Sequence, residues 1–372
     1  MIRVLIVDDS ALVRTVLSAV LSKAADIEVI GVAEDPYVAR DKILELRPDV
    51  ITLDIEMPRM DGLTFLKKLI RHHPMPVVVF SSLSREGGRI ALQALELGAI
   101  EVLGKPAQPE EIGGVVELLA KKIRQAAAAR RGCPPGREST AATPSVADHS
   151  LPVEGRLVAL GASTGGPEAI RHVLSRFPRG MPPTLIVQHM VPRFTEAFAS
   201  RLNDLGTIEV REARDGDELR PGLALVAPGG LHLLVERSGS NLRARVKDGP
   251  KVHFQMPAVD VLFRSVARCV GAGAVGVLLT GMGSDGAEGL LAMREGGAHT
   301  IAQDEDSSVV FGMPRAAIAA GGALEVLPLD RIGDRIVAVL SQAPTGRVTP
   351  EPSDVLAVAG TGAGGARSGA PR

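Results

Sequence analysis

Short apolar runs alternate with amphipathic stretches through the first third of the chain. Apolar runs of this kind are typical of parallel strands that helices cover on both faces, and the stretches between them repeat apolar residues at helical spacing. The alternation predicts an open, doubly wound α/β domain with a five-stranded parallel sheet. The predicted strands are Val4–Val7, Val29–Ala33, Val50–Leu53, Val77–Phe80 and Glu101–Leu103, and the predicted helices are Ala11–Lys23, Pro36–Leu46, Leu63–His72, Gly88–Leu97 and Pro109–Arg124.

Further apolar runs follow in the second half of the chain, and each runs into a polar or glycine-rich turn. Leu157–Leu160, Thr184–Val187 and Ala274–Thr280 are predicted strands, and Glu168–Phe177 has the spacing of a helix. We therefore expect a second α/β domain, built on a mostly parallel sheet.

A chain of 372 residues is long enough for two such cores. Residues 126–153 follow neither period and are rich in Ala, Arg, Pro, Gly, Ser and Thr. Such a composition buries too little apolar surface to offset the entropy of ordering. We assign residues 1–125 to the first domain, 126–153 to a flexible linker and 154–342 to the second domain, and we expect residues 343–372 to form a disordered tail.

Composition narrows the classes of function. A net charge of −1 and an aromatic share of 2% argue against nucleic-acid binding, which needs basic surface and stacking side chains. The first apolar run stops at Asp8-Asp9, so we expect no signal peptide, and no run approaches the length of a membrane span. Two cysteines imply no disulfide framework. We expect a cytoplasmic protein that is not inserted in a membrane.

Polar residues stand where the predicted strands of the first domain end: Asp8 and Asp9 after the first, Asp54 after the third, Ser81 after the fourth and Lys105 after the fifth. In open parallel sheets this edge binds ligands. Three clustered carboxylates need a cation, and oxygen-only ligands suit Mg²⁺. Asp54 could attack a phosphoryl donor, with Lys105 and Ser81 holding the transferred oxygens. A single Asp there could equally be a solvated turn residue, but the ordered set favours a phosphoryl-acceptor site.

A candidate nucleophile lies in Gly161-Ala162-Ser163-Thr164-Gly165-Gly166, between a predicted strand and a predicted helix. A small-residue turn there exposes the Ser163 hydroxyl near the N–H groups of a helix N-terminus. Taken alone, the segment could equally be a phosphate-binding loop. If Ser163 is a nucleophile, the backbone N–H groups of Met282 and Thr164 are the candidate oxyanion donors, and one such donor is typically worth about 3 kcal/mol.

Two further strand ends supply the partners that a serine nucleophile requires. His189 follows the strand Thr184–Val187, and Asp285 follows the strand Ala274–Thr280. In a parallel sheet the three residues converge, so that His189 accepts the Ser163 proton and Asp285 orients the imidazole. His232 and His253 could instead line the cleft, and Asp285 could be a turn residue, because Gly-Ser-Asp-Gly is also good turn chemistry.

Both halves of the chain resemble known families. The first half resembles the receiver domain of two-component response regulators, and the second resembles the chemotaxis protein-glutamate methylesterase (CheB) family. The receiver motifs are Val7-Asp8-Asp9-Ser10, Asp54-Ile55-Glu56-Met57-Pro58 with Asp61-Gly62, and Gly104-Lys105-Pro106. The esterase motifs are Gly161-Ala162-Ser163-Thr164-Gly165-Gly166, Gln188-His189-Met190, Gly281-Met282-Gly283-Ser284-Asp285-Gly286, Ala227-Pro228-Gly229-Gly230 with His232, and Pro257-Ala258-Val259-Asp260-Val261-Leu262-Phe263.

The resemblance implies that Ser163, His189 and Asp285 form the catalytic triad, that Asp54 is phosphorylated, and that Asp8 and Asp9 bind Mg²⁺. It implies hydrolysis of glutamate γ-methyl esters on chemoreceptor signalling helices with release of methanol, deamidation of receptor glutamines, and a chemotaxis histidine kinase as phosphodonor. No cofactor is expected in the esterase site.

The resemblance also implies that the unphosphorylated receiver covers the catalytic cleft. Receivers commonly carry an aromatic residue three positions before the lysine, and this chain has Val102 there. A switch that buries an aromatic ring is therefore not expected. Arg193 and Phe194 are candidate contacts to an acidic receptor surface. Two other functions stay open from the sequence: a non-catalytic response regulator, and an esterase that acts on a substrate other than a chemoreceptor.

Overall fold

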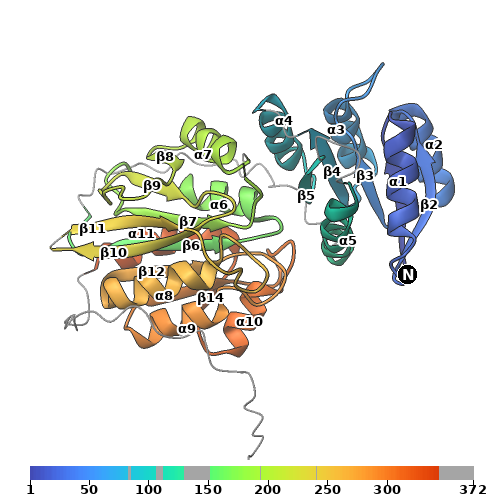
Figure 1. Cartoon of the computed structure of the whole chain (residues 1–372). Coiled ribbons are helices and arrows are strands. Elements are labelled where there is room, and N and C mark those ends of the chain that lie inside the picture. Colours follow the sequence, from blue (N-terminus) through green and yellow to red (C-terminus); the bar gives the residue numbers. More distant parts are fainter. Residues whose placement is uncertain (83–84, 106–111, 130–150, 193, 240, 343–372) are drawn as a thin grey trace, which may run out of the picture.

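The chain folds into two α/β domains that lie end to end (Figure 1). The computed structural model describes residues 1–82, 85–105, 112–129, 151–192, 194–239 and 241–342. The expected tail, most of the expected linker and Arg193 lie outside these residues.

The N-terminal domain is the predicted doubly wound fold. Its five strands pair in parallel in the order β2-β1-β3-β4-β5. Two helices, α1 and α5, cover one face of the sheet, and α2, α3 and α4 cover the other. The elements are β1 Ile2–Val7, α1 Ala11–Leu21, β2 Ile27–Ala33, α2 Pro36–Leu46, β3 Val50–Leu53, α3 Gly62–His72, β4 Val77–Ser82, α4 Arg85–Glu96, β5 Glu101–Lys105 and α5 Ile112–Ala128.

Side-chain caps set where three of these helices begin. Ser10 accepts a hydrogen bond from the amide of Val13, Asp35 accepts from two amides of α2, and Asp61 accepts from the amide of Thr64. Each cap satisfies an amide that the first turn of a helix leaves without a partner. The strands between them are almost fully apolar, so the helices have an apolar surface on each side of the sheet to pack against.

The C-terminal domain is built on a seven-stranded sheet in the order β14-β13-β12-β6-β7-β9-β8, and every pairing in it is parallel. This confirms the predicted mostly parallel sheet. The elements are β6 Leu157–Ala162, α6 Gly166–Leu174, β7 Thr184–Gln188, α7 Phe194–Leu205, β8 Glu209–Glu212, β9 Leu223–Val226, β10 His232–Ser238, β11 Asn241–Lys247, α8 Val259–Cys269, a short 3₁₀ helix Gly271–Gly273, β12 Ala274–Leu278, α9 Ala287–Glu295, β13 His299–Gln303, α10 Met313–Ala319, β14 Glu325–Leu327 and α11 Leu329–Leu340.

One apolar core lies on each face of this sheet. Helices α6, α7 and α11 pack on one face, and α8, α9 and α10 pack on the other. The separate antiparallel hairpin β10–β11 packs on α8, where Ser265 Oγ accepts a hydrogen bond from the amide of Val235 at 2.9 Å. The middle strands β12, β6 and β7 are thereby buried on both sides.

The structure differs from the sequence prediction at both edges of the linker. Helix α5 runs to Ala128, three residues beyond the predicted end of the domain at residue 125. Leu151 is buried in the core of the C-terminal domain and Val153 packs against it. The residues at both ends of this segment are apolar and pack against the core of the neighbouring domain. The average composition of the whole segment does not reveal this, because its middle is polar.

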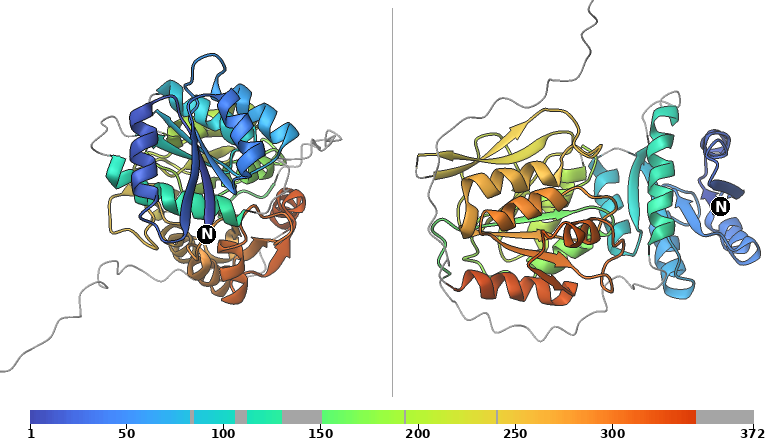
Figure 2. Two further views of the ribbon diagram at one scale, coloured as in Figure 1. Left: turned by 90° about the vertical axis from the view of Figure 1, so that its right-hand side faces the viewer. Right: turned by 90° about the horizontal axis from the view of Figure 1, so that it is seen from below.

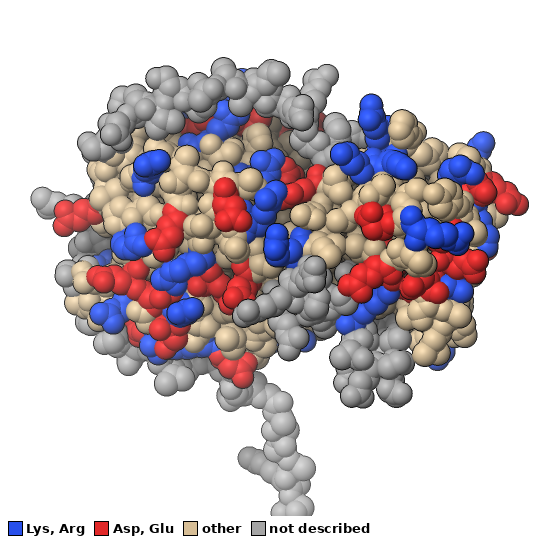
Figure 3. All heavy atoms as spheres, turned by 90° about the horizontal axis from the view of Figure 1, so that it is seen from above, with Lys and Arg blue, Asp and Glu red and all other residues tan. Residues whose placement is uncertain are grey.

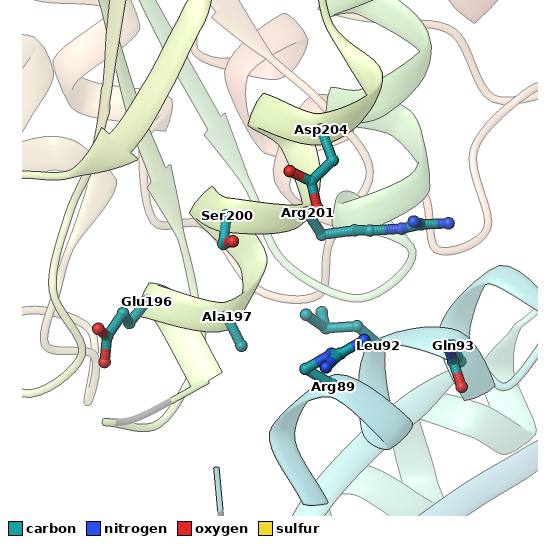
Figure 4. A pocket seen from close by; sticks show the side chains of 8 residues that line it. All are labelled: Arg89, Leu92, Gln93, Glu196, Ala197, Ser200, Arg201 and Asp204. Atoms are coloured by element: carbon teal, nitrogen blue, oxygen red, sulfur yellow. The ribbon is translucent and has the colours of Figure 1, made fainter. Parts of the chain in front are cut away.

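The two domains meet through α4 of the N-terminal domain and α7 of the C-terminal domain. Figure 2 shows the pair of domains from two further sides. Leu92 of α4 joins the core that contains Phe198 and Leu202 of α7. Beside it Arg201 forms a bidentate ion pair with Glu96, at 2.6 and 3.0 Å. The same helices enclose a cavity of about 280 Å³ (Figure 4).

Charge is mixed over the surface. Acidic and basic side chains alternate across both domains on the face drawn in Figure 3, in line with the net charge of −1. No helix within the described ranges is both long and apolar enough to cross a membrane.

Candidate active site

The carboxyl ends of three neighbouring strands bring the candidate catalytic residues together. Strand β6 lies between β7 and β12, and Ala162 at its end pairs with Gln188 at the end of β7. Ser163 and His189 therefore occupy the same register position, one residue beyond the paired ends. On the other side of β6, the amide of Ser163 donates to the carbonyl of Thr280 at 3.0 Å. This geometry is the convergence that the sequence predicted.

The backbone around Ser163 is fixed by four hydrogen bonds. Its amide donates to Thr280, as above, and its carbonyl accepts from the amide of Gly166 at 2.7 Å and from Gln188 Nε2 at 2.9 Å. Thr280 Oγ1 donates to the carbonyl of Thr164 at 2.9 Å. Ser163 is thus held by groups from the end of β7, the segment after β12 and the start of α6. A preorganised position of this kind would lower the cost of reaching a reactive geometry.

His189 and Asp285 form a buried hydrogen-bonded pair. The distance from His189 Nε2 to Asp285 Oδ2 is 2.7 Å. The same carboxylate accepts the amides of Val259 and Asp260, at 2.8 and 2.9 Å, from the first turn of α8. Burial by itself would raise the pKa of Asp285, but the hydrogen bond from His189 and the two amides hold that pKa below its usual range.

The protons of this pair follow from the ionised state of Asp285. An ionised carboxylate only accepts hydrogen bonds, so His189 Nε2 carries the proton and Nδ1 is left as the acceptor nitrogen. Nδ1 is buried and has no hydrogen-bond partner in the described part of the chain. Ser163 Oγ likewise has no partner among those residues. The structure therefore contains the hydrogen bond between His189 and Asp285 but none between Ser163 and His189.

The two candidate oxyanion donors lie on opposite sides of Ser163 in sequence. Thr164 is fully buried, whereas Met282 is 41% exposed. Within the ranges the structure describes, the amide of neither residue donates to another group. Both are therefore available to a ligand, and their role as oxyanion donors stays a prediction.

The two competing histidines, His232 and His253, have other partners. His232 is buried, accepts the amide of Ala258 at 3.2 Å and contacts the carbonyl of Pro250 at 3.0 Å, which fixes the chain ahead of α8. His253 pairs with the buried Asp260 at 2.9 Å. His172 is half-buried on α6, and burial lowers its pKa. His189, by contrast, lies beside Ser163 at the end of the neighbouring strand.

Ser163 and His189 line a cavity of about 280 Å³ whose opposite wall belongs to the receiver. The receiver contributes Glu101 and Val102 of β5, and Leu118, Lys121, Lys122 and Gln125 of α5. Ser163 is only 2% exposed. A polypeptide substrate therefore cannot reach this serine in the domain arrangement of the structure.

One hydrogen bond joins the receiver directly to the nucleophile turn. Thr164 Oγ1 donates to Glu101 Oε1 at 2.7 Å, and Lys122 Nζ lies 2.9 Å from the same oxygen. The Glu101 side chain is buried, with 9% of the residue exposed. A buried carboxylate needs such partners, so this contact favours the closed arrangement of the domains.

The receiver pocket contains the predicted acidic set. Single carboxylate oxygens of Asp8, Asp9 and Asp54 all lie within 4.8 Å of one another. Lys105 Nζ is 2.6 Å from Asp54 and 2.8 Å from Asp8. Burial, reinforced by the like charge of Asp8, raises the pKa of Asp54 to about 6 despite the opposing effect of Lys105. Burial tends to lower the pKa of Lys105, but Asp54 and Asp8 raise it.

Two residues with predicted roles, Ser81 and Phe194, are not placed as the sequence suggested. Ser81 is the last residue but one of β4, where the sequence placed it just after the strand, and its side chain is not among those described. Phe194 is 3% exposed, so it lies in the cavity wall and not on an outer surface. The sequence assigned no role to Gln188, Thr280 or Glu101. Gln188 belongs to one of the esterase motifs and Thr280 directly precedes another, which is the one signal that points to them, whereas nothing local marks Glu101.

Known proteins resemble the chain in both halves. A family model described as CheB methylesterase matches residues 158–336, and one described as response regulator receiver domain matches residues 4–117. The protein-glutamate methylesterase/protein-glutamine glutaminase 2 of Syntrophus aciditrophicus (strain SB) is 51% identical over 91% of this chain and 99% of its own length. The protein-glutamate methylesterase/protein-glutamine glutaminase of Escherichia coli (strain K12) is 51% identical over 91% of this chain and 97% of its own.

A solved structure resembles the C-terminal half. The crystal structure of the Thermotoga maritima CheB methylesterase catalytic domain is 35% identical, covers 50% of this chain and all of its own, and gives a TM-score of 0.49.

Proposed function

This chain belongs to the CheB methylesterase family and carries a response-regulator receiver domain, and from that premise we propose that it is a phosphorylation-regulated protein-glutamate methylesterase with a second activity as a protein-glutamine glutaminase. Its substrates are γ-methyl esters and amides of side chains on chemoreceptor signalling helices. The observation that carries the proposal is the His189–Asp285 pair, whose acceptor Nδ1 is buried without a partner in the cavity that Ser163 lines.

Acylation begins at Ser163. His189 Nδ1 takes the proton from Ser163 Oγ while Oγ bonds to the ester carbonyl carbon. Negative charge develops on the carbonyl oxygen, and the amides of Thr164 and Met282 stabilise it. His189 then gives the proton to the departing methoxy oxygen, so methanol leaves and the glutamyl side chain stays bonded to Oγ.

Deacylation repeats the same steps with water. His189 Nδ1 takes a proton from a water molecule, whose oxygen bonds to the acyl carbon, and returns a proton to Ser163 Oγ as the acyl bond breaks. The product is a glutamate carboxylate. With a glutamine side chain the leaving group is ammonia, a poorer one, so that reaction depends more on proton donation by His189.

We assign the receiver pocket to phosphoryl transfer. Asp54 is the acceptor, Lys105 holds the transferred oxygens together with Ser81, and the phosphodonor is a chemotaxis histidine kinase. Three carboxylates within 4.8 Å of one another suit a hard divalent cation. Asp8, Asp9 and Asp54 would hold Mg²⁺, which neutralises phosphoryl oxygens when it is bound. Ion pairing of Lys105 with Asp54 and Asp8 offsets part of the same charge when the acceptor is free.

Regulation follows from the shared cavity. A receptor helix is far too large for a cavity of about 280 Å³, so the receiver has to move before Ser163 can meet its substrate. Phosphorylation of Asp54 would do this by changing how β5 and α5 pack against the catalytic domain. A tenfold activation requires only about 1.4 kcal/mol, which is within reach of a few lost contacts.

The test is methanol release from methylated receptor fragments by the full chain, with and without a small phosphodonor, beside Ser163→Ala. We expect release that depends on Ser163 and increases with the donor. If the folded protein released no methanol from any receptor fragment, the proposal would be wrong, and an esterase for another substrate or a binding-only regulator would replace it. Release by Ser163→Ala at the rate of the wild type would exclude the assigned nucleophile.

A further inference from the structure

A tight turn with an unusual backbone stands at the rim of the catalytic cavity. Val252 and Gln255 exchange two backbone hydrogen bonds, at 3.1 and 2.8 Å. The residues between them, His253 and Phe254, have φ values of 50° and 62°. Two central residues with positive φ define a turn that normally takes Asn-Gly, because a Cβ disfavours this conformation. Residues held in such conformations cluster at sites that contact ligands.

The base of the turn is anchored. His253 Nε2 lies 2.9 Å from Asp260 Oδ2, and Asp260 Oδ1 accepts the amide of Gly289 at 2.6 Å. Next to the turn, the amide of Gly230 donates to the carbonyl of Met256 at 3.0 Å. These contacts hold the backbone of the turn, and with it the direction of the Cα–Cβ bond of Phe254.

Phe254 is exposed, although phenylalanine is usually buried. It is 88% exposed and lines the same cavity as Ser163 and His189. It belongs to none of the apolar cores formed by the described residues. The strained backbone thus presents an unpacked aromatic ring to the cavity that Ser163 and His189 line, and strain of this kind is typical of ligand-binding sites.

We propose that Phe254 is a specificity-determining residue that packs against an apolar side chain of the substrate helix. The inference rests on the proposed function. A scissile side chain on a helix has neighbours three and four residues away on the same face, about 5–6 Å apart. When the scissile side chain reaches Ser163, one of these neighbours faces the rim where Phe254 projects. Aromatic anchors of this kind carry much of the affinity of protein interfaces.

The test compares a protein substrate with a small one on the full chain in the presence of a phosphodonor. Phe254→Ala keeps Cβ, and with it the backbone preference, while it removes the ring. We expect kcat/KM for a methylated receptor fragment to fall about tenfold, equivalent to about 1.4 kcal/mol, mainly through KM. Hydrolysis of p-nitrophenyl acetate should stay within twofold. Phe254→Leu should recover most of the lost kcat/KM.

The matched control is Leu324→Ala, which removes an apolar side chain that is also exposed and does not line the cavity. It should leave both activities unchanged. Equal kcat/KM of Phe254→Ala and the wild type on the receptor fragment would overturn the inference alone. So would a parallel loss on both substrates, because the turn would then act through the catalytic groups. A wild type that releases no methanol would overturn the proposed function, and this inference with it.

Discussion

At the scale of a single residue, Asp285 connects the proposed catalytic site to the stability of the fold. One oxygen of its carboxylate meets His189 and the amide of Val259, and the other meets the amide of Asp260. The side chain therefore acts as a cap for α8 from a loop that lies 25 positions further along the chain. Negative charge at a helix N-terminus is favourable, and this arrangement keeps Asp285 ionised while it orients the imidazole.

Asp285→Asn should lose both contributions. We expect kcat to fall by about 10³–10⁴-fold, because an amide no longer selects the imidazole tautomer that leaves Nδ1 free. The free energy of unfolding at pH 7 should fall by about 1–3 kcal/mol. The pKa of Asp285 is lower in the folded chain than its unfolded value of about 3.9, so the stabilisation is present above that value and is lost as pH falls through the folded pKa.

Urea unfolding of the wild type and Asp285→Asn at pH 7 and near pH 3 measures this linkage. The gap between the two proteins should be largest at pH 7 and smaller at the acidic end. Asp204→Asn, which changes an exposed carboxylate of α7, serves as the control and should show no gap at either pH. A gap that grew on acidification would mean that the pKa of Asp285 is raised in the folded state.

At the scale of elements, the end of β12 comes very close to the nucleophile. Gly281 follows this strand, and a Cβ built there would lie 2.7 Å from Ser163 Cβ and 2.3 Å from Met313 Sδ. Atoms cannot approach so closely, so either Ser163 or the backbone of Gly281 has to shift. A glycine is needed at this position because the backbone lies so close to Ser163 and Met313 that there is no room for a Cβ, and its φ angle is not unusual.

Gly281→Ala should therefore reduce kcat by at least 10²-fold, because a displacement of about 1 Å is enough to misplace a nucleophile. Gly180→Ala is the matched control, since a Cβ there meets nothing within 4 Å and Gly180 has an ordinary backbone conformation. Burst kinetics with p-nitrophenyl acetate separate acylation from deacylation and show which step is slowed. Full activity of Gly281→Ala would mean that the strand end adapts without moving Ser163.

The elements also show how far the sequence leads. The central strands were predictable, because nearly all of their residues are apolar, and Ser163, His189 and Asp285 followed from their places after β6, β7 and β12. The edge strands were not predicted. Strand β8, for example, is Glu209–Glu212 and has one buried residue, so it has no apolar pattern from which a strand could be predicted. Its conformation is decided by its pairing with β9. The role of Glu101 also depends on a contact that is distant in sequence, because its partner Thr164 lies in the other domain, and the sequence therefore did not predict it.

At the scale of the whole molecule, the two domains line one cavity from opposite sides, and under the proposed function this arrangement would couple phosphorylation to catalysis. We expect Asp54→Asn to remove the response of the esterase rate to a small phosphodonor, because an amide forms no acyl phosphate. Chelation of Mg²⁺ should remove the response of the wild type as well. Methanol release with and without donor measures both, and a response that survived in Asp54→Asn would place the modified residue elsewhere.

The contact between Glu101 and Thr164 makes the closed arrangement testable without phosphorylation. Glu101→Gln keeps an oxygen that can accept from Thr164 but loses the charge, and hydrogen bonds to charged groups are worth about 1 kcal/mol more than neutral ones. The domain contact should weaken by roughly that amount. We therefore expect methanol release without a phosphodonor to rise about fivefold. Glu117→Gln, on an exposed position of α5, should leave the rate unchanged.

A double-mutant cycle with Thr164→Val assigns this effect to the pair. Valine keeps the backbone amide and the approximate shape of threonine but cannot donate to Glu101. If the hydrogen bond holds the receiver over the cavity, the two substitutions together raise the rate by less than the product of their separate effects, because each removes the same interaction. Multiplicative effects would mean that Glu101 acts through Lys122, its other partner, and that the receiver is held by charge on α5 instead of by the nucleophile turn.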